Sequence, residues 1–157
     1  MKRFLLAELP IQNKTIFLRV DYNVPFSEKK ITDNTKIKAS LPTIKYLLQN
    51  NCKIVLATHL GRPKGFSQEY SVAPLARELQ KLLPTKKVVT LDDCVGKNVL
   101  ETIQQGKPQT IFMLENLRFY PEEEKNDSFF AHSLASLGDL YVNDAFGVAH
   151  RKHASVC

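Results

Sequence analysis

The chain has 157 residues, of which 43% are hydrophobic and 24% charged, so its composition is that of an ordinary globular domain and not of a disordered or fibrous protein. Its three cysteines are widely spaced and odd in number, and no apolar run is long enough to cross a membrane, so we expect a cytoplasmic protein without a disulfide framework, a zinc site or a membrane partner. The net charge of +6 favours anionic partners, from nucleic acids to phosphorylated metabolites.

Short apolar and β-branched runs alternate with helical-period stretches along the chain, which indicates βα units around a parallel sheet. The expected strands are Thr15 to Val20, Lys53 to Thr58, Lys87 to Thr90, Thr110 to Leu114 and Leu140 to Asn143. We therefore predict an α/β fold with a doubly wound, Rossmann-like parallel sheet in a three-layer αβα arrangement.

Four helices are expected between these strands. Apolar residues recur at three- and four-residue steps from about Thr35 to Gln49, and Pro42 should reset that helix. The other three are expected to begin at good N-cap residues, which are Ser71, either Asp92 or Asp93, and Asp127.

Polar residues follow four of the five predicted strands. In open parallel α/β sheets, ligands bind beyond the carboxyl ends of the strands, so these loops are the candidate site. Their candidate residues are Asp21 and Asn23 after the first strand, His59 and Arg62 after the second, Arg118 after the fourth and Arg151 after the fifth. Arginine makes paired hydrogen bonds to phosphate or carboxylate oxygens, so three arginines at one edge predict a pocket for a small polyanion.

Each candidate also has a purely structural explanation. His59 could be an ordinary strand-end histidine and Asp21 a turn residue, while Arg118 could pair with Glu122 or Glu123. Four independent loops that place polar groups on one edge favour the site over these accidents.

Two further groups of loop residues are expected to shape the edge. Gly61 and Gly147 would let the backbone approach a ligand closely. Glu115, Asn116 and Asn143 are interpreted as residues that orient the loops.

Common nucleotide and metal motifs are missing. The sequence contains no GxxxxGK[ST] loop, no GxGxxG, no HExxH and no Cys/His cluster with zinc spacing. We therefore expect no metal and no nucleotide cofactor on this chain.

Four segments resemble the phosphoglycerate kinase family and occur in the family's order. They are Arg19-Val20-Asp21-Tyr22-Asn23-Val24-Pro25, Thr58-His59-Leu60-Gly61-Arg62-Pro63, Leu114-Glu115-Asn116-Leu117-Arg118-Phe119-Tyr120 and Asn143-Asp144-Ala145-Phe146-Gly147. The resemblance implies reversible phosphoryl transfer, in glycolysis, between ATP and the carboxylate of 3-phosphoglycerate, with ADP and 1,3-bisphosphoglycerate as products. It also implies that His59, Arg62, Arg118 and Arg151 surround the substrate phosphate and that Asp21 and Asn23 bind near its hydroxyl.

One position departs from the family pattern. The family has an arginine where this chain has Lys36, and the resemblance implies that this residue both binds substrate and stabilises charge on the phosphoryl group in flight. Lysine keeps the charge but not the forked geometry, so we expect a full-length protein with Lys36 to turn over slowly.

The resemblance also implies a two-lobed enzyme. Residues 1–157 are expected to be its N-terminal substrate-binding domain, incomplete at the C-terminus, while Mg-ATP or Mg-ADP is bound by a C-terminal domain absent from this chain. This chain alone should then be inactive as a kinase, because the family reaction needs both lobes to close. We expect a monomer.

Two other functions compete with this interpretation. The chain could be a catalytically inert anion-binding module derived from the same lobe. A nucleic-acid-binding domain is disfavoured, because the arginines lie on glycine-containing loops and not along a helix with interleaved aromatic residues.

Overall fold

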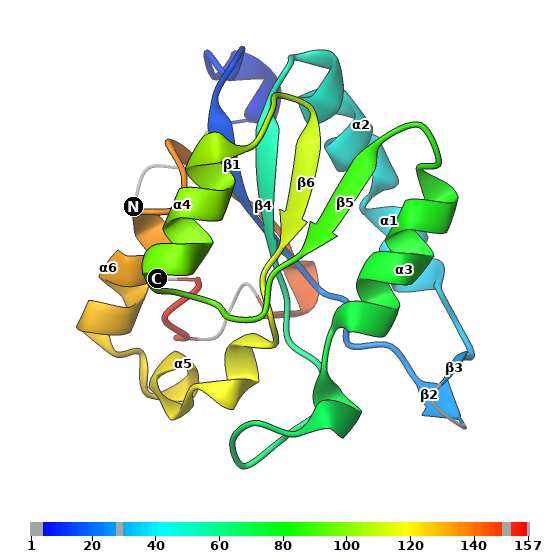
Figure 1. Cartoon of the computed structure of the whole chain (residues 1–157), viewed down its shortest axis with the longest axis vertical. Helices are drawn as coiled ribbons and strands as arrows, with labels where there is room; N and C mark the ends of the chain where they lie inside the picture. Colours follow the sequence, from blue (N-terminus) through cyan, green and yellow to red (C-terminus); the bar gives the residue numbers. More distant parts are fainter. Residues whose placement is uncertain (1–4, 28–29, 149–151, 157) are drawn as a thin grey trace.

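A five-stranded parallel sheet forms the centre of the molecule, as Figure 1 shows in a computed structural model that describes residues 5–27, 30–148 and 152–156. The strands of this sheet are β1 (Thr15–Val20), β4 (Lys53–Ala57), β5 (Lys87–Thr90), β6 (Thr110–Met113) and β7 (Leu140–Asp144). They lie in the order β5-β6-β4-β1-β7, and every pairing is parallel. All five predicted strands are confirmed, with ends that differ by one residue at most.

Helices cover both faces of the sheet, so the predicted three-layer arrangement is confirmed (Figure 1). One face carries α1 (Thr35–Ala39), α2 (Leu41–Gln49) and α3 (Ala73–Leu82), and the other carries α4 (Lys97–Gln105), α5 (Pro121–Lys125) and α6 (Ser128–Ala135). A short antiparallel hairpin of β2 (Phe26–Ser27) and β3 (Lys30–Ile31) and 3-10 turns at Leu6–Glu8, Gln68–Tyr70, Leu117–Phe119 and Phe146–Val148 complete the chain and were not predicted.

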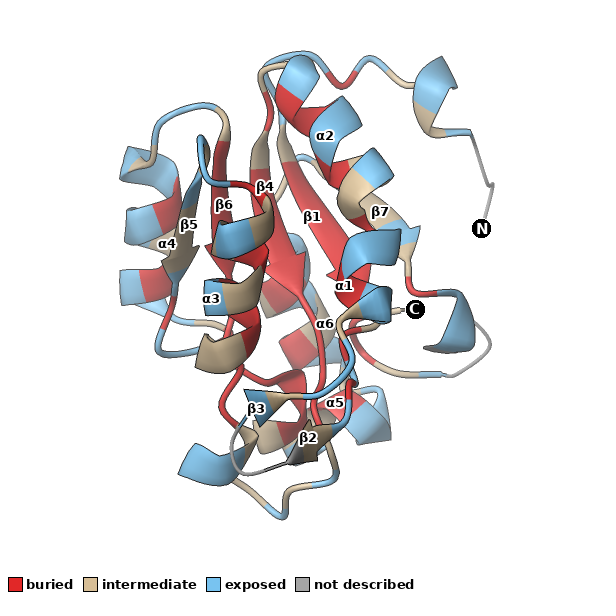
Figure 2. Cartoon of the chain, turned by 90° about the vertical axis from the view of Figure 1, so that its right-hand side faces the viewer, coloured by how far each residue is buried: buried red, intermediate tan, exposed pale blue. Residues whose placement is uncertain are grey.

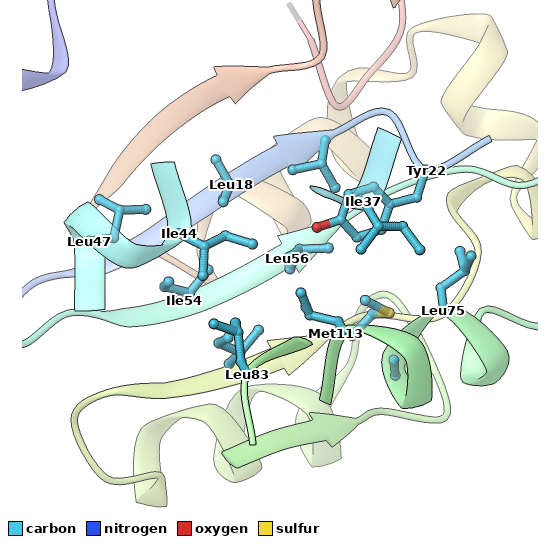
Figure 3. Packing of buried hydrophobic residues seen from close by; sticks show 14 of the residues in the cluster. Leu18, Tyr22, Ile37, Ile44, Leu47, Ile54, Leu56, Leu75, Leu83 and Met113 are labelled. Atoms are coloured by element: carbon cyan, nitrogen blue, oxygen red, sulfur yellow. The ribbon is translucent and has the colours of Figure 1, made fainter. Parts of the chain in front are cut away.

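The strands alternate their side chains between two apolar cores, and Figure 2 shows the central strands buried between exposed helix surfaces. In β1, Leu18 packs toward α1, α2 and α3, whereas Phe17 packs toward α4 and α6. Figure 3 shows the first of these cores, in which Leu18 and Leu56 of the sheet lie near Ile37 and Ile44 of α1 and α2. Burial on both faces explains why the strands are nearly continuous apolar runs.

The expected reset at Pro42 is confirmed. The helical stretch divides at Ser40 into α1 and α2, and Pro42 lies in the first turn of α2, where its missing N–H costs no hydrogen bond.

Two of the predicted helix starts are wrong. α3 begins at Ala73, one residue later than an N-cap at Ser71 predicts, although the Ser71 hydroxyl accepts from the Ala73 N–H at 3.3 Å while it donates to the buried Glu115 carboxylate. Gly96 precedes α4, so neither Asp92 nor Asp93 caps it, and the Asp93 carboxylate instead accepts from the Tyr120 hydroxyl at 2.6 Å. The Asp127 cap is confirmed, since its carboxylate accepts from the Phe130 N–H at 2.8 Å.

Candidate functional site

The carboxyl ends of the parallel strands lie together at one edge of the sheet, at the bottom of Figure 1. The chain leaves β1 and β4 toward the helices of one face and leaves β5 and β6 toward those of the other. β4 and β6 are neighbours in the sheet, and the segments that follow them turn to opposite faces, so a crevice is expected between these two strand ends. Ligands of open α/β sheets bind at such a switch point, so the loops around it form the candidate site.

Asn116 joins the loop after β6 to the loop after β4. Its side-chain oxygen accepts from the N–H groups of Leu60 at 3.2 Å and Arg118 at 3.1 Å. Its side-chain nitrogen donates to the carbonyls of Leu60 at 2.8 Å and Tyr70 at 2.9 Å. Asn116 is fully buried, so these four bonds satisfy an otherwise costly amide and hold the two loops in one arrangement. Its predicted role in loop orientation is confirmed.

Glu115 and Asn143 also orient loops, as predicted. The buried Glu115 carboxylate accepts from the Ser71 hydroxyl and from the Val72 N–H, both at 2.8 Å, and so fastens the beginning of α3 to this edge. Asn143 accepts from the Ala145 N–H at 2.9 Å in the turn after β7.

Three of the predicted site residues form a connected group. Lys36 pairs with Asp21, with 3.0 Å between Nζ and Oδ2. The other Asp21 oxygen accepts from the Asn23 N–H at 3.1 Å, and the Asn23 side-chain oxygen accepts from the Gly61 N–H at 3.0 Å. Partial burial raises the pKa of Asp21, but the hydrogen bonds from Lys36 and from the Asn23 backbone outweigh it, so the pKa lies below its ordinary value. Asp21 is therefore ionised at neutral pH.

His59 lies at the end of β4 and is almost fully buried, with 4% of its surface exposed. Its Nδ1 is 3.0 Å from Nη2 of Arg19, a residue of β1 with no exposed surface. Sequence reasoning did not propose Arg19 for the site. The available signal was a single cation inside an apolar strand next to Asp21, since a buried arginine must have partners.

Arg19 belongs to a buried polar network on the α5 side of the sheet. Its Nε donates to the Ser155 hydroxyl at 2.9 Å, and the Ser155 N–H donates to the Glu123 carboxylate at 2.9 Å. The Ser155 hydroxyl donates to the other oxygen of Glu123. Burial lowers the pKa of Arg19, and the Glu123 charge offsets part of that effect. These contacts hold the segment 152–156 against β1 and α5, next to the site.

Arg118 is buried in the turn after β6, and its Nη1 donates to the Gly61 carbonyl at 2.6 Å. Its ion-pair partner is Glu124, with 3.3 Å between Nε and Oε1, and not Glu122 or Glu123 as the structural alternative supposed. Glu123 is unsuited to that pairing because its carboxylate is turned into the buried network.

The other two arginines predicted for the site are Arg62 and Arg151. Arg62 is exposed in the loop after β4, directly after Gly61. Arg151 lies outside the described residues, so its place beside the others stays a prediction.

The two loop glycines serve the packing of the protein itself. Gly61 has φ +63°, and a Cβ there would lie 2.3 Å from the ring of Tyr70. A Cβ on Gly147 would lie 3.1 Å from the Asp21 carboxylate. Tyr70 and Asp21 therefore leave little room for a side chain at these glycines, and their predicted close approach to a ligand stays a prediction.

A hollow of about 280 Å³ lies away from these loops, between α6, β7 and residues 154–156. Among the described residues, no group of three or more His, Cys, Asp or Glu could hold a metal ion. In the same part of the chain, no helix is both long and apolar enough for a membrane span.

The edge as a whole combines hydrogen-bonding groups with positive charge. Asp21 and Asn23 can bind hydroxyl groups, whereas Lys36, Arg62 and Arg118 can attract phosphate or carboxylate oxygens. This combination suits a small hydroxylated anion better than an apolar ligand.

Comparisons with known proteins agree on one family. The sequence model described as phosphoglycerate kinase matches residues 6–157. A phosphoglycerate kinase of Moorella thermoacetica is 52% identical over 156 residues, which are 99% of this chain and 39% of that protein. The chloroplastic phosphoglycerate kinase 1 of Arabidopsis thaliana is 51% identical over 151 residues, which are 96% of this chain and 31% of that protein.

The fold agrees with a solved structure of the same family. The crystal structure of the phosphoglycerate kinase of Pyrococcus horikoshii superimposes with a TM-score of 0.85 at 38% identity, covering 98% of this chain and 39% of that one. The chain thus spans well under half the length of the relatives that it matches.

Proposed function

The chain belongs to the phosphoglycerate kinase family, and from this we propose that it supplies the 3-phosphoglycerate site of an enzyme that reversibly transfers a phosphoryl group between ATP and the carboxylate of that substrate. The observation that carries the proposal is the hydrogen-bonded edge of the sheet, where Asp21, Asn23 and Arg118 lie in segments joined through Asn116 and Gly61, and where Lys36 of α1 pairs with Asp21. Hydroxyl-binding and cationic groups at one switch point fit a hydroxylated phosphate ester that also carries a carboxylate.

The arginines and the polar residues of the loop after β1 are proposed to bind different parts of the substrate. Arg62, Arg118 and Arg151, with His59, are proposed to hold the substrate phosphate, because forked donors match its oxygens. Asp21 and Asn23 are proposed to bind the hydroxyl. By fixing the substrate at both ends, these residues would place its carboxylate for transfer, which is most of what a protein contributes to this chemistry.

Nucleotide binding is proposed to lie outside these 157 residues. The family uses Mg-ATP, but the described residues offer no metal cluster and the sequence no phosphate-binding glycine loop. We propose that residues 1–157 belong to the substrate domain and that ATP or ADP is held by the family's C-terminal domain.

Lys36 is the residue whose identity bears on the rate. It is half exposed and pairs with Asp21, so a cation is present where the family has an arginine. A lysine supplies a point charge without the arginine fork, so charge on the transferred group would be less well stabilised. We propose that Lys36→Arg in the full-length protein raises kcat by about tenfold or more. An unchanged kcat would remove this role from Lys36.

Substrate binding can be tested directly by calorimetric titration with 3-phosphoglycerate at low ionic strength. We expect saturable binding that Arg62→Ala abolishes, while the control Arg77→Ala, on the exposed surface of α3, leaves it unchanged. No binding by the folded wild-type chain, or equal loss in both variants, would contradict the proposed site.

The inert anion-binding module remains the second candidate, favoured by Lys36. Full-length protein that binds 3-phosphoglycerate but transfers no phosphoryl group, even with Lys36→Arg, would support it. A monomer in the cytoplasm without nucleic-acid or membrane partners is also proposed. The cytoplasmic location is proposed because Cys52 and Cys94 are buried and free, as is usual in a reducing compartment. The chloroplast is the alternative location, because one relative is chloroplastic.

A further inference from the structure

The contact between Arg19 and His59 determines which imidazole nitrogen carries a proton. The two atoms Nη2 and Nδ1 are 3.0 Å apart, and both residues are buried. A guanidinium has five N–H donors and no acceptor. A hydrogen bond at this distance therefore requires Nδ1 to accept, so Nδ1 carries no proton.

The position of the ring proton and the charge of the imidazole follow from this requirement. A neutral imidazole carries one proton, so with Nδ1 as acceptor the proton is on Nε2. The charged form would place an N–H on Nδ1 against the Arg19 donors. We infer that Arg19 is a positioning residue that holds His59 as the neutral imidazole protonated on Nε2.

Arg19 is itself held rigidly enough to act in this way. Its Nε donates to the Ser155 hydroxyl at 2.9 Å, and its Nη1 donates to the Val20 carbonyl. The guanidinium therefore has a partner on each of its three nitrogens, and Glu123 supplies the opposite charge nearby. Because these partners fix the plane of the guanidinium, they also fix the direction from which it approaches the imidazole.

Two further charges act on the histidine and its partner. The Asp21 carboxylate lies close enough to His59 to interact with it electrostatically, and Arg118 opposes the charge of Arg19. Asp21 favours a charged imidazole and Arg19 disfavours it, and the inference rests on the geometry of the 3.0 Å contact with Arg19.

The consequence for ligand binding rests on the proposed function. With its proton on Nε2, His59 has its hydrogen-bond donor on the ring edge opposite Arg19. A donor of this kind suits a phosphate or carboxylate oxygen and contributes direction without charge. The positive charge of the site then comes from the arginines and Lys36.

Long-range ¹H–¹⁵N spectroscopy of the imidazole rings tests the inference in the wild-type chain near neutral pH. The four histidines give four ring patterns, and His59→Gln identifies the one of interest by its loss. We expect an unprotonated Nδ1 and a protonated Nε2. A protonated Nδ1, alone or together with Nε2, would overturn the inference without any further variant.

Variants then separate positioning from general structure. Arg19→Met should abolish the single His59 pattern and give a mixture of ring forms, whereas Arg19→Lys, which keeps a cationic donor, should preserve it. The exposed His132 on α6 should be unchanged in both. A folded Arg19→Met chain with the wild-type His59 pattern would also overturn the inference, and if that variant does not fold, the wild-type spectrum still decides.

Failure of this inference is distinguishable from failure of the proposed function. The ring spectrum is recorded without substrate, so it tests only the Arg19–His59 contact. A chain with the expected spectrum that does not bind 3-phosphoglycerate would contradict the proposed function alone.

Discussion

Replacing Asn116 with alanine tests whether one buried amide holds the site together. The change removes four hydrogen bonds, two to Leu60 and one each to Tyr70 and Arg118. A typical intramolecular hydrogen bond contributes about 1 kcal/mol net, and groups left buried without a partner cost more, so we expect the free energy of unfolding to fall by about 4 kcal/mol. Domains of this size have about 5–15 kcal/mol in total, so Asn116→Ala should be severely destabilised.

Urea unfolding followed by circular dichroism measures this loss, and an unchanged denaturant slope would show that the compactness of the two states is unaltered. Asn98, an exposed residue of α4, provides the control, and Asn98→Ala should change the free energy by no more than about 0.5 kcal/mol. A loss below about 1 kcal/mol in Asn116→Ala would refute the reasoning, because it would mean that water or neighbouring groups replace the amide.

Asn116→Asp refines the same test. The carboxylate keeps the two acceptor contacts but presents an oxygen to the carbonyls of Leu60 and Tyr70. We expect a loss of at least half that of the alanine variant, since two donors are removed and a charge is buried. Wild-type stability in Asn116→Asp would show that the donor half of the amide does not matter.

Three shorter predictions concern the loops and a helix end. Gly61→Ala should destabilise the chain by about 1–3 kcal/mol in urea unfolding, because its Cβ would meet an aromatic ring, and by more than Gly65→Ala, which has φ +121° but no atom within 4 Å of its Cβ. Asp127→Ala should cost about 1 kcal/mol and lower the melting temperature by a few degrees, because α6 loses its cap; no change in melting temperature would contradict the cap. Because its folded-state pKa is lowered, Asp21 contributes stability that is present above its unfolded pKa and lost as pH falls through the folded pKa. The difference in stability between wild type and Asp21→Asn should therefore shrink below about pH 4, and a constant difference from pH 7 to pH 2 would contradict this.

Local sequence patterns were sufficient to predict the fold and much of the candidate site. The strands were predictable because parallel strands buried on both faces are continuous apolar runs. The helices other than α5 were predictable because their apolar residues recur every three or four positions, whereas the short α5 has no such pattern and was not predicted. Asp21, Asn23 and Arg118 could be proposed because the ends of parallel strands necessarily meet at one edge of the sheet, whereas Lys36 was proposed only through the resemblance to the family.

Helix beginnings and the hairpin were less predictable because several polar residues compete for the same role. The Ser71 hydroxyl donates to Glu115 of a distant loop as well as accepting from the Ala73 N–H, and the Asp93 carboxylate accepts from the Tyr120 hydroxyl. Capping propensity is worth about 1 kcal/mol, so a tertiary hydrogen bond of similar size can redirect such a side chain.

The amino edge of the sheet is another feature that only packing determines. Asn13, Asn51 and Gln109 precede β1, β4 and β6 with φ values of 60°, 58° and 61°, and their side chains are hydrogen-bonded from one loop to the next. None of them is a glycine, and although asparagine adopts the left-handed region more often than most residues, the sequence did not single out these positions.

The sequence by itself determined the α/β class, the five strands and the edge at which polar loops gather, because periodicity and strand ends are local properties of the chain. The tertiary structure alone decided which partners these residues take. Arg19 meets Ser155 across 136 residues of sequence and His59 across 40, and Arg118 pairs with Glu124 instead of its other acidic neighbours. Such choices depend on which side chains packing brings within about 3 Å of each other in a dry interior, and no local pattern encodes that distance.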